Sequence, residues 1–135
     1  MSNILITGVG SYLPSNIITN KELPENLNTS DEWIKKRTGI KQRHLVSEGE
    51  LTSTMAIAAS KKALQNANID SQEIDLIIVA TTTPDQTFPA TAVKVQSELN
   101  INIGPAFDIQ AVCAGFIYAL NVGSSLLKTS DFSKA

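Results

Sequence analysis

Cys113 is the only cysteine of the sequence, and its setting fits a nucleophile. It stands between a short apolar run at residues 106–109, which predicts a buried strand, and a segment from 114 to 128 with helical periodicity. The first amides of a helix lack backbone partners and carry partial positive charge, which favours a thiolate. The small neighbours that leave room for an acyl thioester are Ala111, Ala114 and Gly115. An unpaired cysteine can equally be a small buried hydrophobe, and position alone leaves both interpretations open.

A second group of residues could hold a nucleotide. Thr29, Trp33 and Arg37 recur every four residues, so a helix would place them on one face. An indole can stack on adenine, and a guanidinium can pair with phosphate. From spacing alone, Trp33 could instead be a core residue and Arg37 a solvated partner of the helix C-terminus.

Two other patterns predict no active site. Gly8 and Gly10 suggest a dinucleotide loop, but Leu13 stands where the third glycine of that motif belongs. The sole histidine, His44, lies beside Arg43 in a polar stretch, and nothing nearby would orient it as a base. We therefore expect neither a nucleotide loop at the N-terminus nor catalysis by His44.

The elements that must position these residues alternate between strands and helices. The run at 74–80 is rich in β-branched residues without polar alternation, which is typical of a strand covered on both faces. The expected strands are 4–7, 74–80 and 106–109, and the expected helices are 29–38, 52–67, 90–99 and 114–128. This order predicts an α/β fold with a mostly parallel sheet covered by helices. No linker interrupts residues 1–135, so we expect one domain, truncated before its last strands.

Composition excludes several classes of function. With 42% hydrophobic and 18% charged residues, the 135-residue chain has the composition of a soluble globular protein. A net charge of −2 gives no general attraction for nucleic acid or an anionic membrane. One cysteine permits neither an internal disulfide nor a multi-cysteine metal site, and no signal peptide is evident. We predict a cytoplasmic protein without a membrane or nucleic-acid partner.

Four blocks of the sequence resemble β-ketoacyl acyl-carrier-protein synthase III. Residues 111–120, AVCAGFIYAL, resemble the active-site segment of this family, and residues 8–14 resemble its opening strand and loop. The remaining blocks are 29–34 with 37–40, similar to the acyl-CoA-binding helix, and 80–83 with 88–90, similar to the segment that leads into the dimer contact. The similarity covers nearly the whole chain in register and implies the N-terminal half of a thiolase-like fold.

The resemblance implies a role for each candidate residue. Cys113 would accept an acetyl or another short acyl group from acyl-CoA and pass it to malonyl acyl-carrier protein with loss of carbon dioxide, which initiates type II fatty acid synthesis. Thr29, Trp33 and Arg37 would contact CoA, and Phe88 would reach toward the acyl pocket of the partner subunit in a homodimer. The family needs no metal or redox cofactor, because the CoA thioester is a substrate.

The family also uses a histidine and an asparagine from its C-terminal half, and neither lies within these residues. The 135-residue chain alone is therefore expected to be inactive. One alternative is a non-catalytic truncated fragment of a thiolase-fold protein. Another is a different condensing enzyme of this fold, such as a hydroxymethylglutaryl-CoA synthase or a secondary-metabolite ketosynthase.

Overall fold

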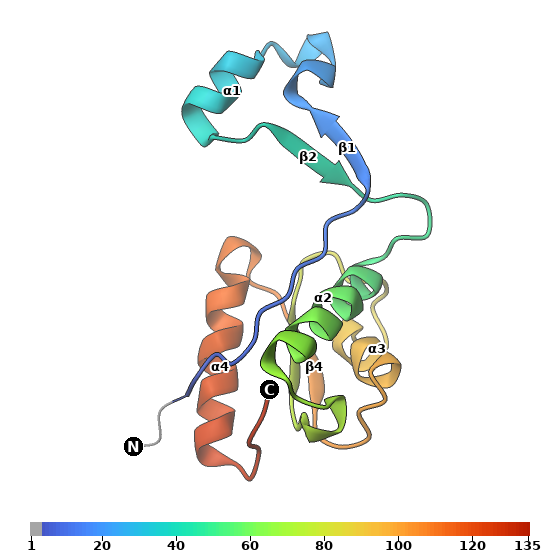
Figure 1. The fold of residues 1–135 in the computed structure, drawn as a ribbon, viewed down its shortest axis with the longest axis vertical. Coiled ribbons are helices and arrows are strands. Elements are labelled where there is room, and N and C mark those ends of the chain that lie inside the picture. The colour runs from blue at the N-terminus through green and yellow to red at the C-terminus, as the bar shows by residue number, and fades with distance from the viewer. Residues whose placement is uncertain (1–3) are drawn as a thin grey trace. The chain divides into compact units, whose positions relative to one another are not determined.

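The structure is a computed structural model that describes residues 4–135 (Figure 1). Contacts within the chain divide these residues into two compact units. The larger unit contains residues 4–12 and Leu51–Ala135, and the smaller unit contains Leu13–Glu50. Each unit is described here by itself. A single domain over 1–135 stays a prediction from the sequence.

The larger unit is built on two parallel strands, β3 (Ile77–Ala80) and β4 (Ala106–Ile109). Ile77 pairs with Ala106, and the register continues to the pair Ala80 and Ile109. The amide of Thr81 then donates to the carbonyl of Ile109 at 3.1 Å and extends the ladder by one bond. The parallel pairing predicted from the apolar runs is therefore confirmed. Both strands end at the same edge of the sheet.

Helices cover both faces of this sheet (Figure 1). On one face lie α2 (Thr52–Ala67) and α3 (Thr91–Glu98), and on the other lies α4 (Gly115–Thr129). Ile77 and Val79 pack against the core that includes Val95, whereas a Cβ built on Gly123 of α4 would lie 3.5 Å from Cδ1 of Ile78. Successive residues of β3 therefore face opposite helix layers, as the two-residue period of a strand requires.

The apolar core of the larger unit lies between α2, α3 and the sheet. Its buried members are Ile74, Val95, Leu99 and Ile101. The outer face of α4 is uncovered, because Phe116, Ile117 and Tyr118 are all exposed. Within residues 4–135, no helix is both long and apolar enough to cross a membrane.

The smaller unit contains an antiparallel pair and one helix. Strand β1 (Asn16–Thr19) pairs with β2 (Gln42–Leu45), and α1 (Asp31–Thr38) lies between them in sequence. Ser30 caps α1 by accepting the amide of Trp33 at 3.1 Å, and Gly39 ends it with φ of 73°. That positive φ is the left-handed conformation that glycine adopts without strain. The end of α1 at Thr38 agrees with the sequence prediction, but the helix begins at Asp31 and not at residue 29, and strands β1 and β2 were not predicted.

The prediction of a buried strand at residues 4–7 is wrong. The segment has no regular secondary structure, and Leu5 and Ile6 are exposed. No described strand pairs with it, and the residues that follow run along α2 instead. There the amide of Val9 donates to Oδ1 of Asn66 at 3.2 Å. Side chains in place of Gly8 and Gly10 would collide with the backbone of α2, so these glycines permit the close approach.

Candidate active site

Cys113 lies at the junction of β4 and α4, as the sequence predicted. After β4 the chain forms a single 3-10 turn, Val112–Ala114, and α4 begins at Gly115. Cys113 is exposed within the described residues, which disagrees with the alternative of a buried small hydrophobe. The amide of Ala114 donates to the carbonyl of Ala111 at 2.9 Å and closes the turn. The thiol therefore lies exposed in the turn between β4 and α4.

A close contact fixes the start of α4 against the sheet. Gly115 is buried, and a Cβ at this position would lie 3.3 Å from the Cβ of Ala80 at the end of β3. That distance is tighter than ordinary van der Waals contact, so a larger residue would push α4 away from β3. The glycine that follows the nucleophile by two positions therefore sets where the helix begins.

The residue before the nucleophile has an unusual backbone conformation. Val112 has φ of 46°, in the left-handed region. A β-branched side chain in this region is a true outlier that costs roughly 1–3 kcal/mol. Val112 begins the 3-10 turn that follows β4, and Cys113 is the next residue of that turn. The strain therefore lies at the point where the candidate nucleophile is displayed.

Phe88 comes from the loop that follows the neighbouring strand. Because β3 and β4 are parallel, their carboxyl ends meet at one edge, and the loops after them emerge there. This edge is where open α/β sheets bind ligands. Phe88 is 86% exposed, which excludes core packing within this chain. The topology thus brings the Phe88 loop and Cys113 to the same edge of the sheet.

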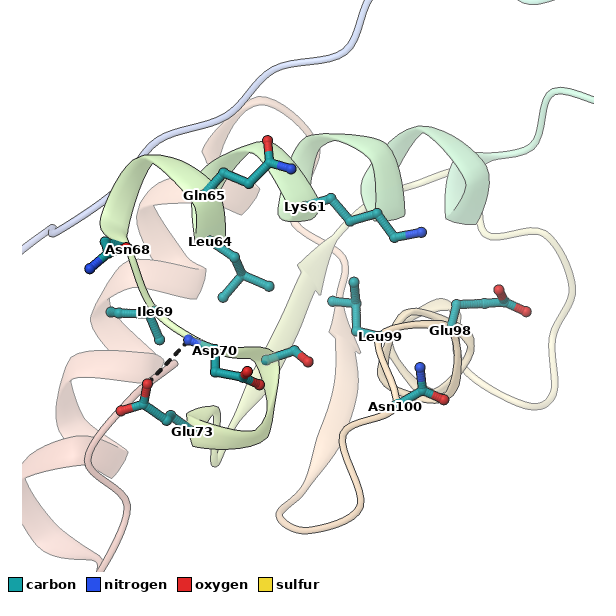
Figure 2. A pocket seen from close by; sticks show the side chains of 11 residues that line it. Lys61, Leu64, Gln65, Asn68, Ile69, Asp70, Glu73, Glu98, Leu99 and Asn100 are labelled. Atoms are coloured by element: carbon teal, nitrogen blue, oxygen red, sulfur yellow. Dashed lines mark hydrogen bonds between the residues drawn. The ribbon is translucent and has the colours of Figure 1, made fainter.

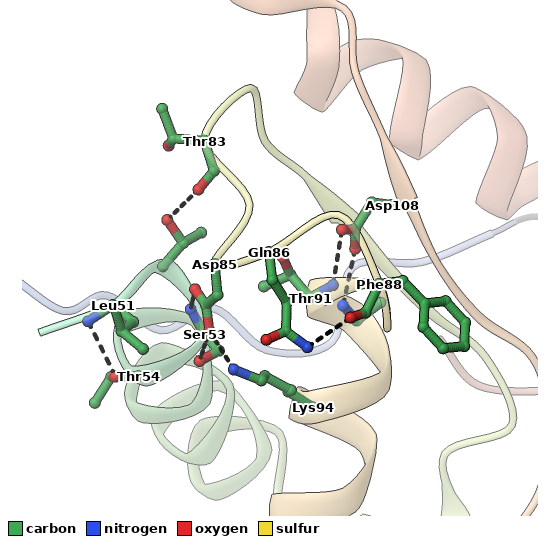
Figure 3. Close-up of polar contacts among 12 residues, drawn as sticks. Leu51, Ser53, Thr54, Thr83, Asp85, Gln86, Phe88, Thr91, Lys94 and Asp108 are labelled. Carbon is green, nitrogen blue, oxygen red and sulfur yellow. Dashed lines mark hydrogen bonds and ion pairs between the residues drawn. The ribbon is translucent and has the colours of Figure 1, made fainter. Parts of the chain in front are cut away.

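The beginning of the Phe88 loop is anchored by Asp85 (Figure 3). Its carboxylate accepts the amide of Ser53 at 3.0 Å and the ammonium of Lys94 at 3.1 Å, and it also accepts the Ser53 hydroxyl. Its side chain is only 2% exposed. Burial opposes the charged form, but the hydrogen bonds from Ser53 and the ion pair with Lys94 hold the pKa of Asp85 below its usual value. One carboxylate thus links the loop to both α2 and α3.

The end of the same loop is anchored by Asp108 of β4. Its two carboxylate oxygens accept the amides of Thr91 and Ala92, each at 2.8 Å (Figure 3). These amides open α3, so Asp108 caps that helix from the adjacent strand. Phe88 therefore stands between two carboxylate anchors. Asp108 is also on the strand that leads to Cys113.

Trp33 and Arg37 form a pair on the surface of the smaller unit. The guanidinium carbon of Arg37 lies 4.5 Å from the ring centroid of Trp33, a cation–π distance. Trp33 is 52% exposed, so the interpretation as a core residue is wrong. The predicted shared face is confirmed for these two residues. An exposed indole and guanidinium side by side can engage an aromatic ring and a phosphate.

Thr29 does not lie on that helix face. Because α1 begins at Asp31, Thr29 precedes the helix and its cap, Ser30. The prediction that Thr29 shares a face with Trp33 and Arg37 is therefore wrong, because a spacing of four residues places side chains on one face only inside a helix.

His44 has a structural role: its Nδ1 lies 2.6 Å from the carbonyl oxygen of Pro14. The expectation that His44 is not a catalytic base stays a prediction.

One groove of the larger unit lies away from Cys113. Its volume is about 840 Å³ (Figure 2). It is lined by the end of α2 and by the turns that lead into β3 and β4, with Lys61, Leu64, Gln65, Asn68, Ile69, Asp70, Ser71, Glu73, Glu98, Leu99 and Asn100. These turns precede the strands, so the groove is at the opposite edge of the sheet from Cys113.

Within the described part of the chain, no group of three or more His, Cys, Asp or Glu residues could hold a metal ion.

Known proteins resemble the chain in sequence over nearly its whole length. It is 59% identical over 131 residues to β-ketoacyl-[acyl-carrier-protein] synthase III of Ehrlichia canis, covering 97% of the chain and 41% of that protein. The corresponding protein of Bradyrhizobium diazoefficiens is 54% identical over 131 residues, with 97% and 40% covered. The chain thus spans about 40% of the length of these relatives. No family model matches it.

Solved structures show the same relationship. The crystal structure of 3-oxoacyl-[acyl-carrier-protein] synthase III from Aquifex aeolicus superposes with a TM-score of 0.84 at 50% identity, covering 92% of this chain and 40% of that one. The priming β-ketosynthase of the R1128 polyketide pathway gives 0.87 at 36% identity, with 94% and 38% covered.

The parallel sheet with helices on both faces is the N-terminal part of a thiolase-like fold. Within that class, the matches confirm the resemblance to β-ketoacyl-acyl-carrier-protein synthase III. They do not test the roles of Cys113, Trp33, Arg37, Thr29 or Phe88, which stay predictions.

Proposed function

We propose that the chain carries the nucleophilic half of a β-ketoacyl-acyl-carrier-protein synthase III, with Cys113 as the residue that accepts the acyl group. The exposed position of Cys113 between β4 and α4 carries this proposal. The Cys113 thiol loses its proton and the resulting thiolate attacks the carbonyl carbon of an acyl-CoA. The carbon–sulfur bond to CoA breaks, and the departing CoA thiolate takes up that proton and leaves as a thiol. The acyl group remains on Cys113 as a thioester.

Trp33 and Arg37 are proposed to bind the CoA nucleotide, because they present an exposed ring and a cation 4.5 Å apart. Phe88, exposed at the edge of the sheet that displays Cys113, is proposed to contact the acyl pocket of a second subunit in a homodimer. Thr29 stays a candidate CoA contact, although it does not share the helix face. Malonyl acyl-carrier protein is the proposed second substrate, no cofactor is expected, and the proposed location is the cytoplasm.

Acetyl transfer tests the proposal directly. The protein is incubated with radiolabelled acetyl-CoA, and the label and intact mass are measured beside Cys113→Ser. We expect one acetyl group on the wild type and none on the variant, because a serine hydroxyl stays protonated at neutral pH. Stoichiometric acetylation of Cys113→Ser would refute the assignment.

The activity of the whole protein needs more than these residues. Condensation develops negative charge on the malonyl thioester oxygen, and removing one donor to such an oxygen typically costs about a hundredfold to a thousandfold in rate. Both ring nitrogens of His44 already have partners, because Nδ1 lies 2.6 Å from the carbonyl oxygen of Pro14 and Nε2 lies 3.2 Å from Nε2 of Gln42. We therefore expect residues 1–135 alone to release no carbon dioxide from malonyl acyl-carrier protein with acetyl-CoA. Turnover at the rate of an ordinary condensing enzyme would contradict the proposed division of the site.

A second candidate is a priming ketosynthase of secondary metabolism. The TM-score of 0.87 to the R1128 enzyme favours it, although the sequence identity is 36% against 50% for the Aquifex synthase. Profiling acyl-CoA donors of increasing length distinguishes the two functions. Preference for acetyl-CoA supports the synthase, and preference for longer or branched donors supports the ketosynthase.

A further inference from the structure

Asn20 is a buried polar residue in the smaller unit. It immediately follows β1 and is only 5% exposed. A buried amide must satisfy its hydrogen-bonding groups, or the cost of removing them from water remains. The side-chain amide of Asn20 forms its hydrogen bonds with the first residue of α1 and with residues that follow this helix.

Both ends of the Asn20 side chain are hydrogen bonded. Its Nδ2 donates to Oδ1 of Asp31 at 2.9 Å and to the carbonyl of Ile40 at 2.7 Å. Its Oδ1 accepts Nη1 of Arg43 at 2.8 Å. The backbone amide of Asn20 also donates to the carbonyl of Lys41 at 3.2 Å. The two donors of the amide and its oxygen are therefore all in use.

These bonds hold α1 at both ends. Asp31 is the first residue of the helix, and Ile40 comes two residues after its last residue, Thr38. Arg43 belongs to β2, so the same amide also ties the helix to the sheet. Hydrogen bonds from Lys35 and then from Asn20 lower the pKa of Asp31 and keep this acceptor charged at neutral pH.

Little else fixes the helix. Among the residues of α1, only Ile34 is buried. A helix of 8 residues is too short to be stable by itself, and one apolar side chain gives it a single point of attachment. The direction in which Trp33 and Arg37 point therefore depends on how the two ends of α1 are held.

We propose that Asn20 is a positioning residue that orients the Trp33–Arg37 pair toward its ligand. The inference rests on the proposed function for the identity of that ligand, CoA. Asn20 itself touches no ligand: it acts through Asp31 and Ile40. Replacing its amide would leave α1 folded against Ile34 but free to rock, and the aromatic ring and the cation would then lose their fixed direction.

Trp33 reports on this directly, because it is the only tryptophan of the sequence. The first variant is Asn20→Ala, with the exposed Asn26→Ala of the same unit as its control. A second pair of variants, Asp31→Ala and Lys35→Ala, leaves the buried Asn20 in place. Asp31→Ala removes the tether to Asn20 and the ion pair with Lys35, whereas Lys35→Ala removes only the ion pair. Far-ultraviolet circular dichroism verifies that each variant is folded.

Two readouts separate the inference from the proposed function. We expect Asn20→Ala and Asp31→Ala to lower the fluorescence anisotropy of Trp33 and to weaken CoA binding about tenfold, equivalent to about 1.4 kcal/mol. Asn26→Ala and Lys35→Ala should match the wild type in both. The affinity is read from quenching of Trp33 as CoA is added, with adenosine 3′,5′-bisphosphate as the second probe.

If Asp31→Ala and Lys35→Ala are folded and give the same anisotropy and affinity, the tether does not position the pair and the inference is overturned. Unfolding of Asn20→Ala leaves that comparison intact. If CoA fails to quench Trp33 in the wild type while the anisotropy changes as expected, the proposed function fails at this site, and Asn20 remains the residue that orients Trp33.

Discussion

Replacing Asp85 by asparagine removes a buried charge that α2 and α3 share. The asparagine keeps the volume and can still accept the amide of Ser53 through one oxygen. The other oxygen accepts the ammonium of Lys94 at 3.1 Å. In the variant an amide nitrogen, which is a donor, takes its place and faces the ammonium, which is also a donor. The Asp85 side chain is 2% exposed and that of Lys94 is 34% exposed, so only the lysine can turn to water.

The expected loss of stability follows from that asymmetry. A hydrogen bond to a charged group contributes about 1.5–3 kcal/mol, and breaking a fully buried pair costs about 3–5 kcal/mol. Because Lys94 regains solvent, we expect the lower of these two ranges, about 1.5–3 kcal/mol, for Asp85→Asn. In a domain of this size that lowers the melting temperature by roughly 3–10 °C. Urea and thermal unfolding followed by circular dichroism at pH 7 measure it.

Glu73→Gln is the matched control. Glu73 pairs with Lys134 at 2.9 Å, a distance similar to that of Asp85 and Lys94, but its side chain is 48% exposed. The glutamine introduced there keeps the bond to the amide of Asp70 while losing the charge. Surface ion pairs add little, so this variant should melt close to the wild type. Equal destabilisation by Asp85→Asn and Glu73→Gln would refute the reasoning that burial of the carboxylate sets how much its ion pair contributes to stability.

The pH dependence gives a second check on Asp85. Its folded pKa is lowered, so its charge stabilises the fold at pH values above the unfolded value, about 3.9. That stabilisation is lost as the pH falls through the lower folded pKa. The stability difference between wild type and Asp85→Asn should therefore be constant near neutral pH and shrink below about pH 4. A difference that grows on acidification would contradict the sign.

Two further substitutions test strained or unsatisfied positions. Thr91 is 1% exposed and its hydroxyl has no hydrogen-bond partner within residues 4–135, so Thr91→Val should stabilise the fold by about 1 kcal/mol in urea unfolding, and a loss would show that the hydroxyl is satisfied. Val112→Gly removes the strain at φ of 46°; it should raise stability by up to about 1 kcal/mol and slow acetyl transfer to Cys113, and an unchanged transfer rate would show that the strain does not hold the nucleophile.

The sequence predicted the elements whose pattern is local. Apolar runs without alternation gave β3 and β4, and the left-handed residues Gly39 and Asn68 mark where α1 and α2 end. Strand β2 escaped detection because it reads Gln42 to Leu45 with three polar residues in a row and no alternation. Its only reason to be extended is the pairing with β1, some twenty residues earlier, and no local pattern reports such a contact.

The anchors of the Phe88 loop were also missed, although one of them left a signal. Asp108 interrupts the apolar run of β4, and an ionised carboxylate inside a covered strand needs donors. A helix N-terminus supplies them, and α3 is the nearest helix before that strand. Asp85 left no comparable signal, because an aspartate after proline in a polar loop is the ordinary composition of a turn.

Asp108 gives the candidate site a reason to be rigid as well as exposed. A nucleophile that exchanges acyl groups with large thioesters must be open to solvent, yet its position relative to the groups around it must not vary. Strand β4 meets both requirements: the turn that follows it carries the exposed Cys113, and its own Asp108 carboxylate accepts the two amides that follow the Phe88 loop. A displacement of α3 therefore moves the Phe88 loop and the strand of Cys113 together. The positions of Phe88 and Cys113 are therefore coupled. The coupling arises because the carboxylate of Asp108 in β4 accepts the first amides of α3, the helix that follows the Phe88 loop.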